Sequence, residues 1–252
     1  MHRYDKIINK TENKLNRIRR RSKYKFIINS PFDKNTLITL HHLLNSHIIS
    51  YVNGPVKAGK ESVLFWAVDQ NGCDIALKIY LTTNSIFKKR HMYFRHHHSV
   101  INLNNSNNII ELWARKEFKN LKNCIRVNIP VVKPIYVFKN ILVLEFIGNN
   151  GIPNKTLAES TPTQYDYDCF IKILTNMYQR AQLVHGDLSS FNVFKTNEGL
   201  LFFDLSSSVP ISHPNADMLL KRDIDNMSHF FKNKGLVVYN PLDVFYSVKN
   251  VI

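Results

Sequence analysis

Three polar side chains lie beside buried segments in the C-terminal half of the chain, and their types suit phosphate chemistry. Asp187 and Asn192 are five residues apart in the segment Leu183–Val193, and Asp204 follows the apolar run Leu200–Phe203. Magnesium takes oxygen ligands, few of them from protein, with water and phosphate oxygens completing its octahedron. Asn192 and Asp204 therefore suit metal binding, and Asp187 is left to orient or deprotonate a hydroxyl group or a water molecule.

Each of these residues also has an ordinary structural explanation. Asp187 could cap a turn, Asn192 could form an Asx-turn, and Asp204 could start the loop of three serines that follows it closely. That explanation would have to hold three times in one fixed order, so the spacing favours a site for metal and phosphate.

A lysine and a glutamate upstream could act on the same phosphates. In Ile75–Tyr80, alternation places Lys78 on the opposite face from Leu77 and Ile79. Alone, that pattern indicates a strand with one wet face. Glu117, however, lies at the flank of the apolar stripe of an expected helix, from which it can reach a strand lysine. A Lys–Glu pair beside a nucleotide fixes the lysine against phosphate oxygens.

The segment Gly54–Glu61 resembles a P-loop but departs from it twice. It nearly fits G-x-x-x-x-G-K-[ST], with Glu61 in place of the hydroxyl residue. A P-loop also leads into a helix, whereas Val63–Val68 is β-branched and aromatic, which indicates a strand. We therefore reject the P-loop and expect a loop between two strands that covers phosphates with Lys57 and Lys60.

A strand that ends in Glu145–Gly148 runs into the cluster Gly148–Gly151. Glycine and asparagine permit unusual backbone angles, so we expect a hinge between two packed units at this cluster. Exposed backbone just before the hinge could hydrogen-bond the edge of an adenine. A plain buried strand followed by a linker is compatible with the same pattern.

The periodicity of the chain predicts a β-rich lobe followed by a mainly helical lobe, an α+β fold. Helical spacing predicts helices over 34–46, 111–126, 164–182 and 215–234. Alternation and turn residues predict strands over 49–53, 62–69, 73–80, 133–138 and 141–146, and two short strands around the turn 197–199. The stretch 81–110 is polar and irregular, and its run of histidines at 96–98 is best explained as a surface loop.

Composition excludes wholesale disorder and collagen-like repeats, because 44% of residues are hydrophobic and 21% are charged. The net charge of +15 favours a polyanionic partner such as nucleic acid. Three scattered cysteines make neither a disulfide framework nor a zinc site, which favours a reducing compartment. The start of the sequence has no apolar signal region, and no apolar run suits a membrane span.

About half of the excess positive charge lies in residues 1–25, which hold ten Lys/Arg residues and two acids. One interpretation is a solvated arm. The other is contact with a phosphate backbone, or a nuclear address.

Taken together, Lys78, Glu117, Asp187, Asn192 and Asp204 follow the protein-kinase plan. In detail the chain resembles the RIO family of atypical protein kinases, in the branch without a winged-helix N-terminal domain. The resemblance covers about residues 34 to 235. The matching stretches are Ala58–Ser62, Leu77–Tyr80, Trp113–Leu121, Val131–Pro134, Leu144–Gly148, Leu183–Asn192, Phe203–Val209, His213–Pro214 and Lys221–Ile224.

The resemblance implies a trimmed two-lobed kinase-like fold that binds ATP and Mg²⁺. It implies a basic arm over 1–33, an N-lobe over 34–148 with a flexible loop at 81–110, and a C-lobe over 149–252. It implies catalytic roles for Asp187, Asp204 and Lys78, and metal binding by Asn192 and Asp204. The ATP-binding residues that it implies are Lys57, Gly59, Lys60, Glu61, Ser62, Lys78, Glu117, Glu145 and Ile147.

The resemblance further implies work on maturation of the small (pre-40S) ribosomal subunit, with rRNA as a partner and no membrane. The protein would act in the cytoplasm, with a nuclear or nucleolar stage and the choice between monomer and homo-oligomer left open. Family members are understood to act as ATP-driven switches as well as serine kinases, so Asp204 itself is a candidate phosphoryl acceptor. Ser85, Ser99 and Ser106 are the candidate serine acceptors.

Two departures from ordinary protein kinases accompany this resemblance. Asp204-Leu205-Ser206 stands where a D-F-G triplet would be, and Pro214 comes only ten positions after Asp204, which leaves little room for a peptide-docking segment. Both agree with the RIO family.

Two alternatives belong to other functional classes. Aminoglycoside or choline phosphotransferases also use H-G-D-x-x-x-x-N, but Ser189 and Ser206 replace the histidine and the acid that are usual there. A non-catalytic assembly factor that binds RNA through a basic surface is the other, and the presence of all five polar residues argues against it.

Overall fold

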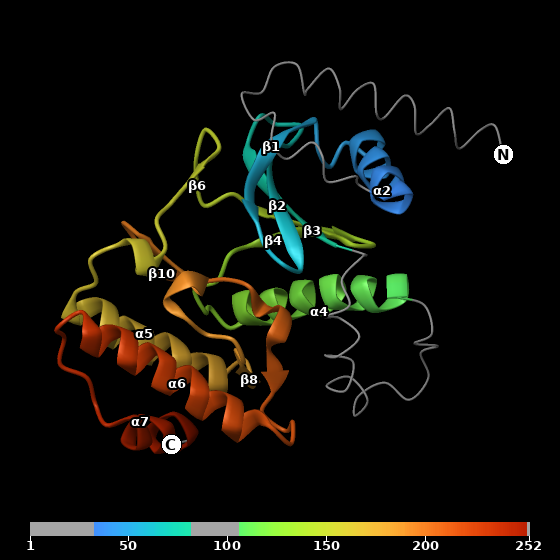
Figure 1. Cartoon of the computed structure of the whole chain (residues 1–252). Coiled ribbons are helices and arrows are strands. Elements are labelled where there is room, and N and C mark those ends of the chain that lie inside the picture. Colours follow the sequence, from blue (N-terminus) through green and yellow to red (C-terminus); the bar gives the residue numbers. More distant parts are fainter. Residues whose placement is uncertain (1–32, 82–105, 251–252) are drawn as a thin grey trace. The chain divides into compact units, whose positions relative to one another are not determined.

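The computed structural model describes residues 33–81 and 106–250 of the chain (Figure 1). The predicted basic arm, except for its last residue, and most of the predicted loop 81–110 lie outside these residues. The candidate acceptors Ser85 and Ser99 and the histidines at 96–98 lie outside them as well.

The described residues fall into two compact units. Unit 1 is the chain up to Phe118 together with Pro134–Pro153, and unit 2 is Lys119–Lys133 together with the chain from Asn154. Helix α4 (Ser106–Arg126) contributes to both units, because its last two turns are bonded to unit 2. The predicted lobes 34–148 and 149–252 assign all of this helix to the first lobe, and these ranges stay a prediction.

Unit 1 is built on a five-stranded antiparallel sheet with the strand order β1-β2-β3-β5-β4. Its strands are β1 (Tyr51–Ala58), β2 (Ser62–Val68), β3 (Asp74–Tyr80), β4 (Pro134–Phe138) and β5 (Ile141–Glu145). Four of the five predicted strands are therefore confirmed to within one residue at each end. Their turns form because Gly72 and Lys139 adopt positive φ, as tight hairpins require.

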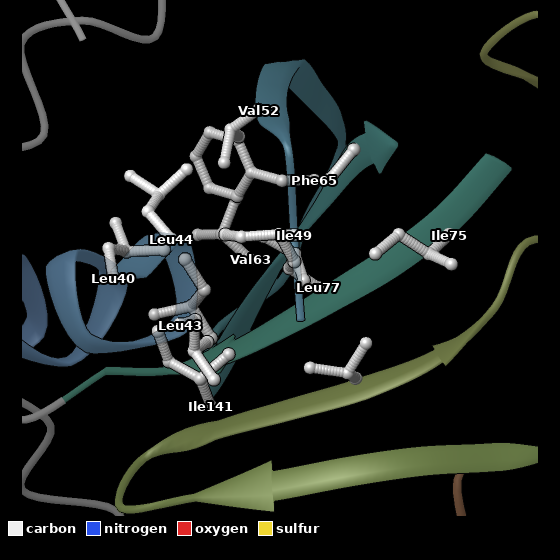
Figure 2. Close-up of a cluster of buried hydrophobic side chains, with 13 residues drawn as sticks. Leu40, Leu43, Leu44, Ile49, Val52, Val63, Phe65, Ile75, Leu77 and Ile141 are labelled. Carbon is white, nitrogen blue, oxygen red and sulfur yellow. The ribbon is translucent and has the colours of Figure 1, made fainter. Parts of the chain in front are cut away.

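One face of this sheet makes the core of unit 1 against helix α2 (Lys34–Asn45). Leu40, Leu43 and Leu44 point from the helix toward Val63 and Leu77, as Figure 2 shows. Asp33 starts the helix by accepting a hydrogen bond from the Thr36 backbone N–H at 2.7 Å. The core face takes every second residue of each strand, which leaves the opposite face for Lys78.

Two boundaries in unit 1 differ from the prediction. Strand β1 continues through Gly54 and Pro55 to Ala58, so the first five of the eight residues of the expected loop 54–61 are strand. Proline is tolerated because β1 is an edge strand with two irregularities in its pairing. Helix α4 starts at Ser106 rather than 111, because buried Ile109 and Ile110 extend its apolar stripe into the asparagine-rich segment.

The expected hinge at 148–151 is an ordered hairpin. Strands β6 (Gly148–Asn149) and β7 (Ile152–Pro153) pair around Asn150 and Gly151, whose φ angles are 50° and 78°. Two consecutive positive φ angles in a two-residue loop make a type I′ turn. The unusual backbone angles expected at this cluster are therefore confirmed, and the division between units 1 and 2 falls just after it, between Pro153 and Asn154.

Unit 2 is mainly helical. Its α-helices besides the end of α4 are α5 (Gln164–Gln179), α6 (Ala216–Asn233) and α7 (Pro241–Lys249). Its short strands are β8 (Leu183–Val184), β9 (Val193–Thr196), β10 (Gly199–Phe202) and β11 (Val209–Pro210). Three 3₁₀ turns complete it: η2 (Leu157–Glu159), η3 (Ser190–Asn192) and η4 (Leu205–Ser207).

Aromatic side chains form the core of unit 2. Tyr167 and Phe170 on α5 contact Phe231 on α6, with ring centroids 5.1 and 5.7 Å from that ring. Phe170 also lies 6.2 Å from the ring of Phe202 on β10. Helix α5 is thereby packed against both α6 and the β9–β10 hairpin.

The sequence prediction for unit 2 is right about α5, α6 and the β9–β10 hairpin, and wrong in two places. Helix α5 ends at Gln179 rather than 182, because Gln182 adopts a φ of 57°. Helix α7 was not predicted, although Asn240 caps it and Pro241 occupies its first turn, which is a standard start signal.

Within residues 33–81 and 106–250, no helix is long and apolar enough to cross a membrane. All three cysteines are free thiols: Cys73 is exposed, Cys169 is half-buried and Cys124 is buried. Burial raises the pKa of Cys124 to about 12.

Candidate active site

In unit 1, the predicted lysine–glutamate pair is formed. Lys78 Nζ on β3 lies 3.0 and 2.9 Å from the two carboxylate oxygens of Glu117 on α4. Glu117 is 1% exposed and Lys78 is 8% exposed, so the pair is buried. Tyr80, two residues along the same face of β3, also donates its hydroxyl to Glu117. The sequence prediction did not include Tyr80.

Cross-strand pairing places a second amine on the face that carries Lys78. Lys57 pairs with Leu64, and Leu64 pairs with Lys78, so the three side chains form one row across β1, β2 and β3. Because strands are about 4.8 Å apart, the two lysine backbones are about 10 Å apart. Lys57 is exposed, and this row could present both amines to one string of phosphate groups.

The predicted phosphate-covering loop is a short turn after β1. The Gly59 N–H donates to the Ser62 carbonyl at 2.9 Å, which closes the turn around Lys60 and Glu61. Gly59 and Lys60 are exposed, and Ser62 pairs with Tyr80 as the first residue of β2. These four residues therefore lie at the same end of the sheet as Lys57 and Lys78.

The predicted adenine-binding segment lies at the other end of β5. Glu145 pairs with Ile75 and is the last residue of the strand, and the half-buried Ile147 precedes the hairpin β6–β7. The backbone of residues 146 and 147 lies beyond the sheet ladder, which leaves its N–H and C=O groups for other hydrogen bonds.

In unit 2, the β9–β10 hairpin brings Asn192 and Asp204 to one end. Val193 at the start of β9 pairs with Phe202 at the end of β10, and the Phe203 N–H donates to the Asn192 carbonyl at 3.1 Å. The Asn192 side chain donates to the Asp187 carbonyl at 2.8 Å. The three predicted residues of this unit are therefore connected by two hydrogen bonds and one strand pairing.

Asp204 has an unusual backbone conformation. Its φ and ψ are 61° and 62°, the left-handed region that a non-glycine residue enters at a cost of about 1–2 kcal/mol. Its Oδ1 accepts the Ser206 hydroxyl at 2.7 Å. Strain of this kind persists only where the surroundings impose it, and it is typical of functional sites.

The donor set fits Mg²⁺. Asn192 and Asp204 offer one amide oxygen and one carboxylate, and the Asn192 amide nitrogen is already engaged with Asp187, so its oxygen is the group that remains for a cation. Magnesium is usually bound through one or two protein oxygens plus phosphates. No group of three or more His, Cys, Asp or Glu side chains within the described ranges could hold a metal.

His185 connects this hairpin to the loop that carries Asp187. The ring is fully buried, and its Nε2–H donates to the Phe203 carbonyl at 3.1 Å. Its Nδ1 accepts from the Asp187 N–H at 3.4 Å. His185 is thus held in one tautomer between the carbonyl of Phe203 and the backbone of Asp187. The Asp187 side chain itself is exposed.

Asp223 on α6 is a site residue whose role the sequence prediction missed. Its two oxygens accept the N–H groups of Gly186 and Leu188 at 2.7 and 2.9 Å, and the neighbouring Arg222 donates to the Gly186 carbonyl. Burial raises the pKa of Asp223, and the hydrogen bonds from the two N–H groups oppose that shift. The sequence does carry one indication of this role: Asp223 interrupts the apolar stripe of helix α6, at a position where the helical spacing calls for a hydrophobic residue.

Gly186 is required by its position. Its φ is 77°, and a Cβ there would lie 2.8 Å from the Ser207 carbonyl oxygen. The convergence of the Lys78 pair with Asp187, Asn192 and Asp204 on one nucleotide stays a prediction.

Comparisons with known proteins agree with these observations. The RIO domain family model matches residues 63–242. Serine/threonine-protein kinase RIO1 of Homo sapiens is 34% identical over 222 residues, which cover 84% of this chain and 39% of that protein. The RIO-type serine/threonine-protein kinase Rio1 of Haloferax volcanii is 33% identical over 211 residues, which cover 82% and 72%. The chain thus spans less than half of its human relative.

A solved structure has a similar fold. The Rio2 kinase-ADP/Mg²⁺-phosphoaspartate complex from Chaetomium thermophilum superposes with a TM-score of 0.64 at 20% identity, covering 84% of this chain and 65% of that one. The predicted α+β kinase-like fold is confirmed by this similarity. The family model and the relatives above 30% identity establish that this chain belongs to the RIO family of atypical protein kinases.

Proposed function

We propose that the protein is a RIO-type serine/threonine kinase and ATPase that binds Mg-ATP. The observation that carries this proposal is the buried ion pair between Lys78 and Glu117, 2.9 Å apart. A buried ion pair costs desolvation energy and is weak evidence for stability, so its presence here favours a functional role. The names of the relatives, all serine/threonine-protein kinases, support the same reaction.

Each residue has a distinct role in this proposal. Lys78, held by Glu117, contacts phosphate oxygens, with Lys57 and the Gly59–Ser62 turn beside them. The backbone at Glu145 and Ile147 hydrogen-bonds the adenine. Asn192 and Asp204 hold Mg²⁺, which supplies charge neutralisation for the transferred phosphoryl group. Asp187 orients the attacking hydroxyl group or water molecule.

The phosphoryl acceptor defines the mode of action. In the switch mode, an Asp204 oxygen attacks the γ-phosphorus, an acyl-phosphate bond forms, the bond to the β-phosphate oxygen breaks and ADP is released. In the kinase mode, a serine hydroxyl oxygen attacks the γ-phosphorus in place of Asp204, its proton passes to the Asp187 carboxylate, and ADP is again released. The solved relative described as a phosphoaspartate complex supports the first mode for the family.

Mg²⁺-dependent ATP turnover tests the proposal. We expect slow or single turnover in the parent, and loss of turnover in Asp187→Asn and Asp204→Asn with unchanged thermal unfolding. Asp168→Asn, which alters an exposed acid on α5, is the matched control and should keep parent activity. Turnover at the parent rate in both site variants would refute the catalytic assignment.

The nature of the phosphorylated product distinguishes the two modes. After reaction with γ-labelled ATP, an acyl-phosphate on Asp204 is cleaved by hydroxylamine, whereas a phosphoserine is stable to it. Rapid phosphorylation of an amino-alcohol or a sugar would instead support the small-molecule phosphotransferase.

We also propose that the protein acts in the cytoplasm on the pre-40S particle and contacts rRNA. Support comes from the net charge of +15 and from the segment 119–133, which has four basic residues and no acid. Lys119, Lys122 and Arg126 are exposed and lie at spacings of three and four, on one face of α4. Such a stripe suits the phosphate backbone of RNA.

Fluorescence anisotropy with a labelled rRNA fragment tests the contact. Replacing these three basic residues by glutamate should weaken RNA binding and reduce its salt dependence, and a matched triple change at Lys155, Lys172 and Lys232 should do neither. Equal loss in both triples would mean that only net charge matters. Unchanged affinity in the α4 variant would refute this surface.

A further inference from the structure

The hairpin β6–β7 directly follows the segment proposed to bind adenine, and it is fastened to the sheet of unit 1. Asp74, the first residue of β3, makes the connection with both carboxylate oxygens. Its Oδ1 accepts the indole Nε1–H of Trp66 at 2.8 Å, and its Oδ2 accepts the backbone N–H of Asn150 at 2.9 Å. One carboxylate thus joins strand β2 to the tip of the hairpin.

The turn also rests directly on the indole ring. Gly151 has a φ of 78°, and a Cβ at this position would lie 2.3 Å from Cε3 of Trp66. No side chain other than hydrogen fits between the turn and the ring. Two constraints therefore require glycine at position 151: the positive φ angle and the close approach of the backbone to the indole ring.

This contact lies on the face of the sheet that carries Lys78. Trp66 pairs with Ala76 and Val68 pairs with Asp74, so Trp66 and Asp74 share the face of Leu64, Ala76 and Lys78. Leu144 pairs with Ala76 from the other side. The hairpin is therefore fixed to the outer end of the surface on which a nucleotide base would lie.

The fastening limits the freedom of residues 145–148. Glu145 is held by the ladder to Ile75, and Gly148 is held by its pairing with Pro153 in the hairpin. With both ends fixed, the two residues between them have few conformations. A ligand that hydrogen-bonds their backbone then orders little on binding, which favours affinity.

We infer that Asp74, Trp66 and Gly151 form a clamp that pre-orders the segment 145–148 and thereby sets the affinity for the adenine base. These are positioning residues, since none of them is required to touch the nucleotide. The inference rests on the proposed function. It predicts that loosening the clamp weakens nucleotide binding but leaves the chemical step intact.

The test compares nucleotide affinity with turnover in variants of the full chain. Asp74→Ala removes both hydrogen bonds, and Gly151→Ala forces the turn off the indole ring. We expect each to weaken Mg-ADP binding, measured by calorimetry, and to raise KM for ATP by about five- to tenfold, with kcat within twofold of the parent. Trp66→Phe keeps an aromatic side chain and the hydrogen bond between Asp74 and Asn150, so its loss of affinity should be smaller.

Asp69→Asn is the matched control. Asp69 accepts backbone hydrogen bonds from Asn71 and Cys73 in the turn between β2 and β3. Like Trp66 and Asp74 it belongs to the β2–β3 hairpin, but these hydrogen bonds do not involve the β6–β7 hairpin. Its affinity for Mg-ADP should equal that of the parent. Equal weakening in this control would show general damage to the hairpin and overturn the clamp.

The indole N–H resonance of Trp66 gives a readout that a purely structural role would not move. The chain has two tryptophans, so the two indole signals are assigned with Trp66→Phe. We expect the Trp66 signal to shift on addition of Mg-ADP in the parent and not in Asp74→Ala. If Gly151→Ala fails to fold, Asp74→Ala still decides the matter.

Failure of the clamp and failure of the proposed function give different results in these experiments. A parent that binds Mg-ADP together with clamp variants that bind it equally well would overturn the clamp and leave the proposed function standing. A parent that binds no nucleotide at all would overturn the proposed function and the clamp with it.

Discussion

Asp223 lies behind Asp187, holding the backbone on both sides of it. Its carboxylate accepts the N–H groups of Gly186 and Leu188, at 2.7 and 2.9 Å, and is itself fully buried. The exposed side chain that is proposed to orient the nucleophile is therefore mounted on a loop whose position is set by α6.

Changing this acid should impair catalysis more than nucleotide binding. Asp223→Ala leaves two N–H groups without an acceptor, at a cost of about 1–3 kcal/mol each, and releases the loop. We expect kcat for ATP turnover to fall at least tenfold, with KM changed less than threefold. Asp225→Ala, an exposed acid on the same helix, is the control and should behave like the parent.

The buried pair in unit 1 should show strong coupling. Lys78→Met leaves Glu117 charged and buried, which typically costs about 3–5 kcal/mol, whereas the double variant Lys78→Met with Glu117→Gln removes that charge. In urea denaturation we expect the double variant to be more stable than the single one, although neither should bind Mg-ATP like the parent. Simple additivity of the two changes would contradict this account.

The strained backbone of Asp204 predicts that glycine is a more stable replacement at this position than alanine. Asp204→Gly and Asp204→Ala both remove the carboxylate, but alanine keeps the unfavourable positive φ. The glycine variant should therefore be more stable than the alanine variant by about 1 kcal/mol, and both should be inactive. Equal unfolding free energies would indicate that the loop relaxes after the side chain is lost.

Asp166 should make unit 2 sensitive to acid. Its burial alone would raise the pKa, but hydrogen bonds from Lys195 and Thr163 outweigh this and lower the pKa below its ordinary value. A lowered folded-state pKa contributes stability above the unfolded pKa of about 3.9, and this stability is lost as the pH falls through the folded value. The ion pair to Lys195 measures 2.7 Å.

Thermal unfolding across pH measures this contribution. Asp166→Asn should be less stable than the parent at pH 7 by about 1.5–3 kcal/mol, and the difference should shrink below about pH 4. A difference that stays constant from pH 7 to pH 3 would mean that the charge of Asp166 does not matter.

The residue pattern alone predicts much of the fold, because unit 1 obeys simple alternation. The Lys78–Glu117 pair follows from one strand period and one helix period, and Asn192 and Asp204 follow from a short hairpin with an obvious turn. Each of these placements comes from the pattern of one helix, strand or hairpin, although Lys78 and Glu117 themselves are 39 residues apart. The placements succeed because the side chain period of a strand or helix leaves few choices.

The residues that were missed bind backbone N–H groups of other segments rather than a side chain of opposite charge. Asp223 acts on Gly186 and Leu188 from 35 to 37 residues away, and Asp74 reaches Asn150 across 76 residues. The periodicity of a helix or strand does not predict contacts with the backbone of another segment. The unusual backbone angles at Asn150 and Gly151 were predicted from the residue types, but the contact of Gly151 with the indole of Trp66 was not, because no local pattern specifies it.

The free thiols give unit 1 a natural attachment point for a probe. Cys73 is exposed and stands next to Asp74, whereas Cys124 is buried with a pKa raised to about 12 and Cys169 is half-buried. Thiolate is the reactive form of cysteine, so a maleimide dye at neutral pH should label Cys73 first. Without any engineered cysteine, the protein can thus carry a fluorophore on Cys73, the residue next to Asp74, whose carboxylate binds the β6–β7 hairpin.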